Sequence, residues 1–339
     1  MTDHAEDGSA RPEVAGGQDT RSAVAIGIDI GGTHLRAARV TADGDLHEAV
    51  RRQTPAHAPA QLVDVLVEVI EGFNGGLPVG IGMAGLVSID GTVRYGPNIG
   101  IRDLPLAREL EQRVGRAITV LNDASAATFA EQRVGSARGY LDVVMFTLGT
   151  GVGGGVTQAG DLVLGRSGYA GETGHMIVSE GGRRCPCGNR GCIEAYASGT
   201  AIGAIARDRL AEGDEASSLR DRDRVDGRAV SDAAHAGDAV AQDVLATAGR
   251  WLGTAAASVV NVLDPDIIVV GGGAASNTAP WLLPAAQRAM RERLLGAEFR
   301  EPPAIELATL GDDAGTVGAG LYAATEPDAT GRDANGARR

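Results

Sequence analysis

One short pattern occurs twice in this chain and limits the folds that are open to it. Residues 23–30 form an apolar, β-branched run that ends at Gly31-Gly32-Thr33, and residues 142–148 form a second run that ends at Gly149-Thr150-Gly151. A further strand-like segment follows the glycines in both places. An apolar run that enters a glycine turn is typical of a buried strand. We therefore predict an internally duplicated α/β protein, built from two copies of one module.

The rest of the chain alternates between helical and strand-like patterns. Residues 60–73 place five aliphatic side chains, from Leu62 to Ile70, at helical spacing. The charged run 220–228 is predicted to be a solvated loop. Further helices are predicted at 106–114, 124–133, 239–263, 281–295 and 315–324, and strands at 35–41, 44–51, 79–83, 118–121, 156–158, 267–270 and 305–310.

A third apolar run enters glycines at Gly271-Gly272-Gly273. Glycine lets the backbone approach an anion closely and directs its amides at oxygen, so the three turns together predict a site for a nucleotide polyphosphate. Asp29 lies two residues before Gly31. A carboxylate beside phosphates is repelled unless a divalent cation intervenes, which predicts Mg²⁺ at this position. The alternative is that Asp29 only caps the turn.

Asn122 and Asp123 follow the strand-like run 118–121. A carboxylate at the start of a helix can accept the proton of a substrate hydroxyl, while a neighbouring amide orients the substrate ring. The alternative is that Asp123 serves only as the N-cap of the following helix.

All three cysteines of the chain lie within eight residues, as Cys185, Cys187 and Cys192, and His175 lies just upstream. Three thiolates and one imidazole fill a tetrahedral shell and leave no position for water, which predicts a structural zinc ion. A redox pair is disfavoured because one residue separates the first two cysteines, and a disulfide would leave one thiol unpaired. The remaining alternative is a surface loop with incidental cysteines.

Two acidic residues, Glu172 and Glu194, flank this cluster in the sequence. An imidazole that binds zinc presents its second nitrogen, here that of His175, in a fixed direction. Carboxylates accept hydrogen bonds from hydroxyl groups, so the combination suits a polyol substrate. The alternative for Glu194 is the solvated start of a helix.

The formal net charge is −13, and no basic patch offsets it. This balance argues against nucleic acid or an anionic membrane as the main partner. No apolar run is long enough to span a bilayer. Residues 1–22 and 325–339 are polar and are predicted to be disordered tails. Three reduced thiols at a zinc site fit a cytoplasmic location.

The chain contains no lysine, and all 31 of its basic side chains are arginines. Base composition of the genome is the simplest explanation. The consequence is that neither a P-loop lysine nor a protein-kinase lysine is available. Backbone amides, a metal ion and arginine must therefore bind any phosphate.

In this order the motifs resemble the ROK family of sugar kinases and repressors, most closely its ATP-dependent glucokinases from high-GC Gram-positive bacteria. The zinc segment, 175–192, is the most specific part, and the likeness runs from about residue 23 to residue 324. The matching segments are Asp29-Ile-Gly-Gly-Thr33, Pro97-Asn98, Asn122-Asp123-Ala124, Leu148 to Gly155, Glu172-Thr-Gly-His175, Cys185 to Cys192 with Glu194, and Gly271 to Gly273.

The resemblance implies an actin-like (ribonuclease H-like) fold of two domains, 23–123 and 124–324, with a central cleft and with the final helix, 315–324, packed on the N-terminal domain. It implies phosphorylation of a hexose hydroxyl by Mg-ATP, most simply glucose to glucose 6-phosphate, in a homodimer or homotetramer. Asp123 would be the general base. The hexose would be lined by Asn98, Asn122, Asp123, Glu172, His175 and Glu194, and the nucleotide by the three glycine turns.

The chain departs from the glucokinase pattern near the sugar. Ile101 stands where such sequences usually carry tryptophan, and His34 stands where they carry lysine. The acceptor therefore stays open to N-acylmannosamine, N-acetylglucosamine, fructose, allose or a C7-cyclitol. A polyphosphate-dependent kinase is disfavoured by the cysteine cluster. A sugar-sensing repressor is disfavoured because the 22 polar residues before the first strand are too few for a DNA-binding module.

Overall fold

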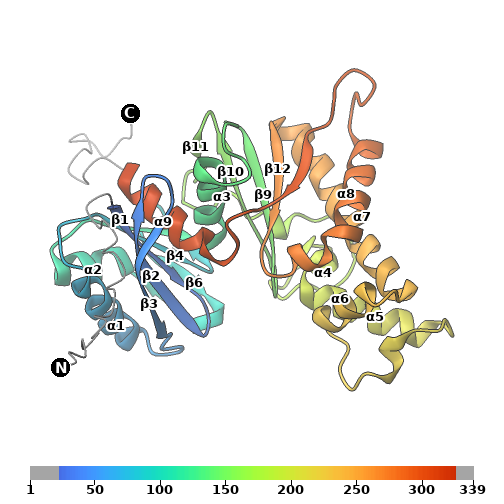
Figure 1. The fold of residues 1–339 in the computed structure, drawn as a ribbon, viewed down its shortest axis with the longest axis horizontal. Coiled ribbons are helices and arrows are strands. Elements are labelled where there is room, and N and C mark those ends of the chain that lie inside the picture. The colour runs from blue at the N-terminus through green and yellow to red at the C-terminus, as the bar shows by residue number, and fades with distance from the viewer. Residues whose placement is uncertain (1–22, 326–339) are drawn as a thin grey trace, which may run out of the picture.

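A computed structural model describes residues 23–325, which form two α/β modules side by side (Figure 1). The predicted tails lie outside the described residues, except that Thr325 is the last residue of a helix. No helix in the described part of the chain is long and apolar enough to cross a membrane.

The first module is a five-stranded sheet in the order β3-β2-β1-β4-β8. Its three antiparallel strands come first in the sequence, and two parallel strands follow at the other edge. The helices α1 (Pro59–Gly72) and α2 (Leu106–Val114) bury apolar side chains in the same core as the sheet. The strands are β1 (Ala23–Ile30), β2 (His34–Thr41), β3 (Leu46–Gln53), β4 (Val79–Met83) and β8 (Ile118–Asn122).

The second module repeats this order as β11-β10-β9-β12-β13, again with three antiparallel strands followed by two parallel ones. The predicted duplication is therefore confirmed at the level of topology. The strands are β9 (Val143–Leu148), β10 (Val152–Gln158), β11 (Asp161–Leu162), β12 (Ile267–Gly271) and β13 (Ala304–Leu307). The helices are α4 (Glu194–Ala197), α5 (Gly199–Glu212), α6 (Gly227–His235), α7 (Ala239–Leu263) and α8 (Ala275–Arg293).

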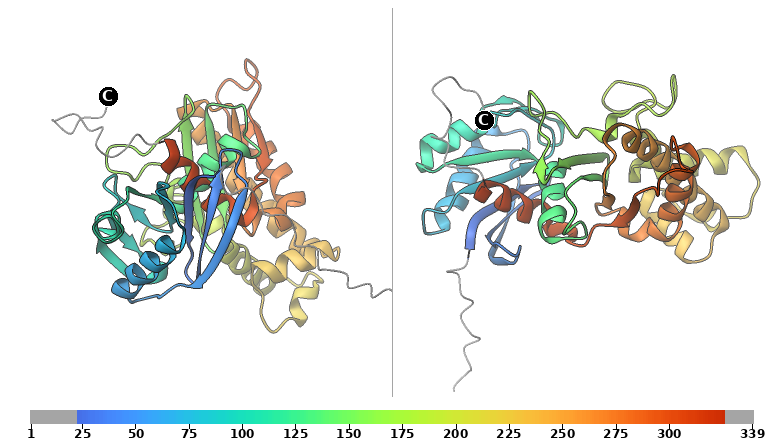
Figure 2. Two further views of the ribbon diagram at one scale, coloured as in Figure 1. Left: turned by 60° about the vertical axis from the view of Figure 1, so that its left-hand side comes forward. Right: turned by 90° about the horizontal axis from the view of Figure 1, so that it is seen from above.

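Two helices, α3 (Asp123–Val134) and α9 (Ala314–Thr325), lie between the sheets (Figures 1 and 2). Although α9 is the last element, it packs against β1 and β4 of the first module, as expected. Glycines make this approach possible, since a Cβ at Gly27 or Gly80 would collide with carbonyl oxygens of α9. Because α3 packs on both sheets, the domain boundary at 123/124 stays a prediction.

Several local features differ from the sequence-based expectations. Strand β10 begins at Val152 and includes the glycines at 153–155, because these pair with β9 instead of forming a turn. Helix α8 begins six residues before the predicted start. The charged run ends inside α6, and neither α5 nor α6 was predicted. A small sheet of β5 (Leu86–Val87), β6 (Val93–Gly96) and β7 (Ile101–Leu104) was also missed.

Candidate active site

The parallel strands of the first module bring Asp29 and Asn122 to one edge of the sheet. Strands β1, β4 and β8 run in the same direction, so their carboxyl ends meet at one edge. Asp29 is the penultimate residue of β1, and Asn122 is the last residue of β8. Asp123 follows as the first residue of α3, and it therefore lies at the same edge.

Asn122, and not Asp123, caps the following helix. Its Oδ1 accepts a hydrogen bond from the Ser125 amide at 3.0 Å, and its Nδ2 donates to the carbonyl of Gly85 at 3.1 Å. Both ends of the Asn122 amide therefore have protein partners. Asp123 accepts one bond, from the Ala124 amide to its Oδ1 at 2.8 Å. The interpretation of Asp123 as the N-cap is thus wrong, and no other residue of the range 23–325 donates a hydrogen bond to its second oxygen.

The two aspartates influence each other electrostatically. Burial, together with the negative charges of Asp123 and Asp312, raises the pKa of Asp29 to about 7, although the nearby Arg36 lowers it. Burial also raises the pKa of Asp123 above its ordinary range, an effect that the Ala124 amide partly offsets. Two desolvated carboxyls of the same sign are costly without a counter-charge, so this pair suits a divalent cation.

Glu172 and His175 form a second side of the site. Glu172 directly precedes the short 3₁₀ turn η3 (Thr173–His175), which ends at His175, and Nε2 of His175 lies 4.0 Å from Oε2 of Glu172. Burial raises the pKa of Glu172, His175 lowers it, and Asp123 and Glu194 raise it further. The fold therefore brings Asp123, Glu172, His175 and Glu194 into one region.

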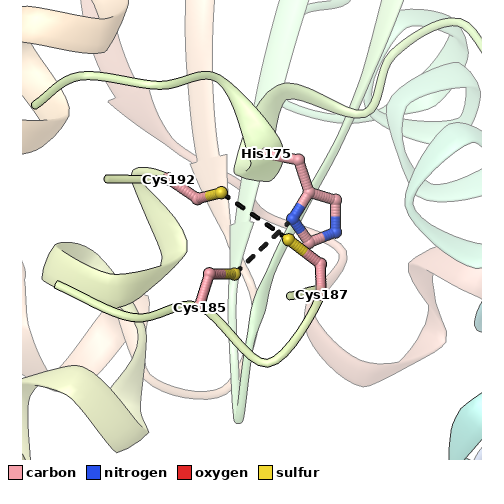
Figure 3. Close-up of side chains that lie close together, drawn as sticks. All are labelled: His175, Cys185, Cys187 and Cys192. Carbon is pink, nitrogen blue, oxygen red and sulfur yellow. Dashed lines mark hydrogen bonds between the residues drawn. The ribbon is translucent and has the colours of Figure 1, made fainter. Parts of the chain in front are cut away.

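The three cysteines and His175 converge on one point (Figure 3). Their ligand atoms all lie within 4.8 Å of one another, with 3.7 Å between the sulfurs of Cys187 and Cys192. Tetrahedral zinc with bonds of about 2.3 Å places sulfurs about 3.8 Å apart, so the geometry and the donor set both fit zinc. Nδ1 of His175 faces the sulfur of Cys185 at 3.9 Å, which leaves Nε2 directed at Glu172.

Glu194 links the cysteine cluster to the second glycine turn. Its Oε2 accepts a hydrogen bond from the Val152 amide at 2.9 Å, and the sulfur of Cys185 lies 3.4 Å from its Oε1. The residue begins α4 but is half-buried, so it is not a freely solvated helix start. A contact between Glu194 and a sugar stays a prediction.

Two of the glycine turns lie side by side in the second module. The parallel strands β9 and β12 end at Leu148 and Gly271, so their turns share one edge. Gly272 has a φ of +89°, and a Cβ there would collide with the main chain of Leu148. The turn at Gly149 to Gly151 is held from α5, where the Gly199 amide donates to the carbonyl of Gly149 at 2.8 Å. The hydroxyl of Thr200 donates to the carbonyl of Thr150, also at 2.8 Å.

The first glycine turn lies next to the predicted sugar loop. Gly32 and Thr33 are exposed, and Gly32 lies beside Asn98, which is exposed in the 3₁₀ turn η2 (Pro97–Ile99). The Thr54 hydroxyl donates to the carbonyl of Gly31 at 2.8 Å and so fixes the turn. Sequence reasoning missed Thr54, Gly199 and Thr200, because each reaches its turn from a distant part of the chain.

Two modules with the same strand order, each with a glycine turn after its first strand, define the actin-like class of two-domain proteins. The chain belongs to the ROK family, whose model matches residues 25–326.

Individual relatives agree with this assignment. The chain is 36% identical over 318 residues to a glucokinase of Streptomyces coelicolor, covering 89% of this chain and 98% of the relative. It is 33% identical over 311 residues to an N-acetylmannosamine kinase of Escherichia coli, with the same two coverages. A crystal structure of a ROK family glucokinase from Streptomyces griseus, in complex with glucose and AMPPNP, superposes with a TM-score of 0.74. That match has 38% identity over 87% of this chain and 97% of the other.

Proposed function

We propose that this protein is an ATP-dependent sugar kinase that phosphorylates a hexose hydroxyl, with glucose as its acceptor. The observation that carries the proposal is the position of Asp123. Its carboxylate is not used for helix capping, and its charge raises the pKa of both Asp29 and Glu172, so it lies near both. The glucokinases among the relatives support glucose as the acceptor.

Asp123 is proposed as the general base. The sugar hydroxyl oxygen forms a bond to the γ-phosphorus of ATP, and the bond between this phosphorus and the β–γ bridging oxygen breaks, so that ADP leaves. The proton of the hydroxyl passes to the free carboxylate oxygen of Asp123. Because burial raises the pKa of this carboxyl, its ionised form is a stronger base than an exposed aspartate.

Asp29 and the glycine turns are proposed to hold Mg-ATP. The turns at 31–33, 149–151 and 271–273 supply amide donors to phosphate oxygens, apart from the amides of Gly31 and Gly149, which donate to the carbonyls of His34 and Gly151. Asp29 would bind Mg²⁺, directly or through water, and the ion would add to the positive charge that Arg36 supplies. When bound, Mg²⁺ neutralises charge on the phosphates.

The zinc site is proposed to shape the sugar-binding wall. Zinc bound by His175, Cys185, Cys187 and Cys192 would fix the His175 ring, whose Nε2 could then donate to a sugar hydroxyl beside Glu172. Asn98 and Glu194 are proposed to contact the same sugar. Asn122 is proposed to approach the sugar while it caps α3.

A coupled assay of ADP release tests the acceptor. Glucose, N-acetylmannosamine, N-acetylglucosamine, fructose, allose and a C7-cyclitol are compared by kcat/KM, with Asp123→Asn as the inactive control. We expect glucose to exceed each other acceptor at least about tenfold, a difference of about 1.4 kcal/mol in transition-state binding. A higher kcat/KM for N-acetylmannosamine than for glucose would identify N-acetylmannosamine as the preferred acceptor. No ADP release with any acceptor would contradict the kinase proposal.

The cellular location and the oligomeric state of the enzyme are also proposals. We expect a cytoplasmic homodimer or homotetramer, because reduced thiols are needed for zinc binding and because the resemblance implies an oligomer. Size-exclusion chromatography with light scattering tests the assembly, and a monomeric mass would contradict it.

A further inference from the structure

The chain crosses between the two modules twice. Each passage includes a helix that lies between the sheets, α3 or α9, and a connecting segment. We call the segment from α3 to β9, residues 135–142, the first crossing, and the segment from β13 to α9, residues 308–313, the second crossing. Glu131 lies in α3 where these two crossings meet, and its side chain has no solvent exposure. A buried carboxylate between two connecting segments calls for an explanation, because desolvation of its charge is costly.

The carboxylate of Glu131 binds both crossings at once. Its Oε1 accepts hydrogen bonds from the amides of Thr309 and Leu310, at 2.9 and 2.8 Å. Its Oε2 accepts bonds from the amide and hydroxyl of Ser136, at 2.7 and 3.0 Å, and from the Thr309 hydroxyl at 3.3 Å. No arginine of residues 23–325 pairs with it, so hydrogen-bond donors alone stabilise its charge.

The surrounding sequence is fitted to this arrangement. The main-chain carbonyl of Glu131 accepts the amides of Gly135 and Ala137, at 3.1 and 3.0 Å, so the first crossing is held by the backbone as well. A Cβ at Gly135 would collide with Oε2 of Glu131. Glycine at this position therefore allows the carboxylate to reach Ser136.

Both crossings lead directly to the site carboxylates. Asp123 begins α3, eight residues before Glu131, which is about 12 Å along the helix. The second crossing contains Asp312, which pairs with Arg36 of β2 at 3.1 Å, and continues into α9, where a Cβ at Gly315 would lie 2.8 Å from Oδ1 of Asp29. A change in the angle between the crossings therefore changes how Asp123 faces Asp29.

We propose that Glu131 is a positioning residue that ties the two crossings into one hinge. Its carboxylate makes the crossings move together, so the modules close on sugar and nucleotide with Asp123 and Asp29 in a fixed relation. Both oxygens must be acceptors, because Oε1 faces the two amides of the second crossing, while Oε2 faces Ser136 of the first crossing and the Thr309 hydroxyl. The inference rests on the proposed kinase function, since closure is expected around its two substrates.

The variant Glu131→Gln tests the hinge in the full chain. An amide has one acceptor oxygen, so its NH₂ group must face the donors of one crossing. We expect kcat at saturating ATP and glucose to fall about tenfold or more, while the Kd for the nucleotide analogue AMPPNP, measured by calorimetry, changes less than about twofold. Small-angle X-ray scattering should show a contraction of the wild type with glucose and AMPPNP, and a smaller contraction of the variant.

Gln132→Met is the matched control, because Gln132 is also buried in α3 but bonds only the first crossing, through the carbonyl of Tyr140 at 3.0 Å. Its kcat and contraction should equal those of the wild type. If Glu131→Gln keeps the kcat and the contraction of the wild type, the proposal is wrong, even if the melting temperature of the variant falls. If Glu131→Gln does not fold, the milder Ser136→Ala/Thr309→Val variant decides: a lower kcat with unchanged AMPPNP affinity supports the hinge, and an unchanged kcat overturns it.

Failure of the two proposals can be told apart. A wild-type protein that phosphorylates no sugar contradicts the kinase function. An active wild type that does not contract with both ligands contradicts the hinge alone.

Discussion

Replacing Asp29 by asparagine should stabilise the ligand-free protein while it removes activity. Asp29 lies at the end of β1, and its carboxylate accepts no hydrogen bond from any residue in the range 23–325. Burial and the charge of Asp123 raise its pKa from the ordinary 3.8 to about 7. Asparagine has the same shape but carries no charge, so it avoids the free-energy cost of ionising a buried carboxyl.

The sign and size follow from the linkage between protonation and folding. A folded-state pKa above the unfolded value means that stability is fully present below pH 3.8 and is lost as the pH rises towards 7. At about 1.4 kcal/mol per pH unit, the upper limit of the loss is about 4 kcal/mol. Because Asp29 keeps some contact with water, we expect Asp29→Asn to exceed the wild type by about 1–3 kcal/mol at pH 8. At pH 5 the gain should be less than half of this.

Urea unfolding followed by circular dichroism, at pH 5 and pH 8 in buffer without Mg²⁺ or chelator, measures this difference. Asp232→Asn is the matched control, because Asp232 is exposed on α6 and the substitution makes the same change in net charge. Mg-ATP should stabilise the wild type more than Asp29→Asn, and the variant should lose most of its kinase activity. A gain in stability that is equal at both pH values, or a loss at pH 8, would refute the reasoning.

Three further substitutions test the site and the fold. Asp123→Asn should lower kcat about 10²–10⁴-fold and leave the zinc content unchanged by mass spectrometry; near-normal turnover would show that another group is the base. Cys187→Ser should lose zinc and weaken glucose binding together, because metal binding and local folding are coupled; calorimetry that finds normal glucose affinity in zinc-free protein would separate the two. Gly80→Ala should destabilise the protein by about 1–3 kcal/mol, because its Cβ would collide with the carbonyl of Ala319. Gly76→Ala, with open space around it, is its control, and equal melting temperatures for the two variants would contradict close packing by α9.

Local features of the fold and of the site could be predicted from the sequence. The strands at Ala23–Ile30 and Val79–Met83 and the helices at Leu106–Val114 and Ala239–Leu263 have the predicted ends. Their apolar spacing and flanking glycines act over a few residues. The three cysteines are also close in the sequence, so their convergence needed only one loop and His175.

Contacts between residues that are far apart in the sequence could not be predicted from it. The amphipathic helix α6 was hidden in a charged region, and the glycines at 153–155 entered a strand because β9 offers them hydrogen-bond partners. Asn122, and not Asp123, caps α3, and its amide also donates to the carbonyl of Gly85, which is distant in the sequence.

The sequence by itself therefore determined which chemical groups this protein has and the strands and turns that carry them. Tertiary structure decided which of these groups meet, as Asp29 meets Asp123 and as Glu131 meets Thr309. It also decided how strongly their pKa values move, because desolvation depends on every element packed around a side chain and on none of them alone.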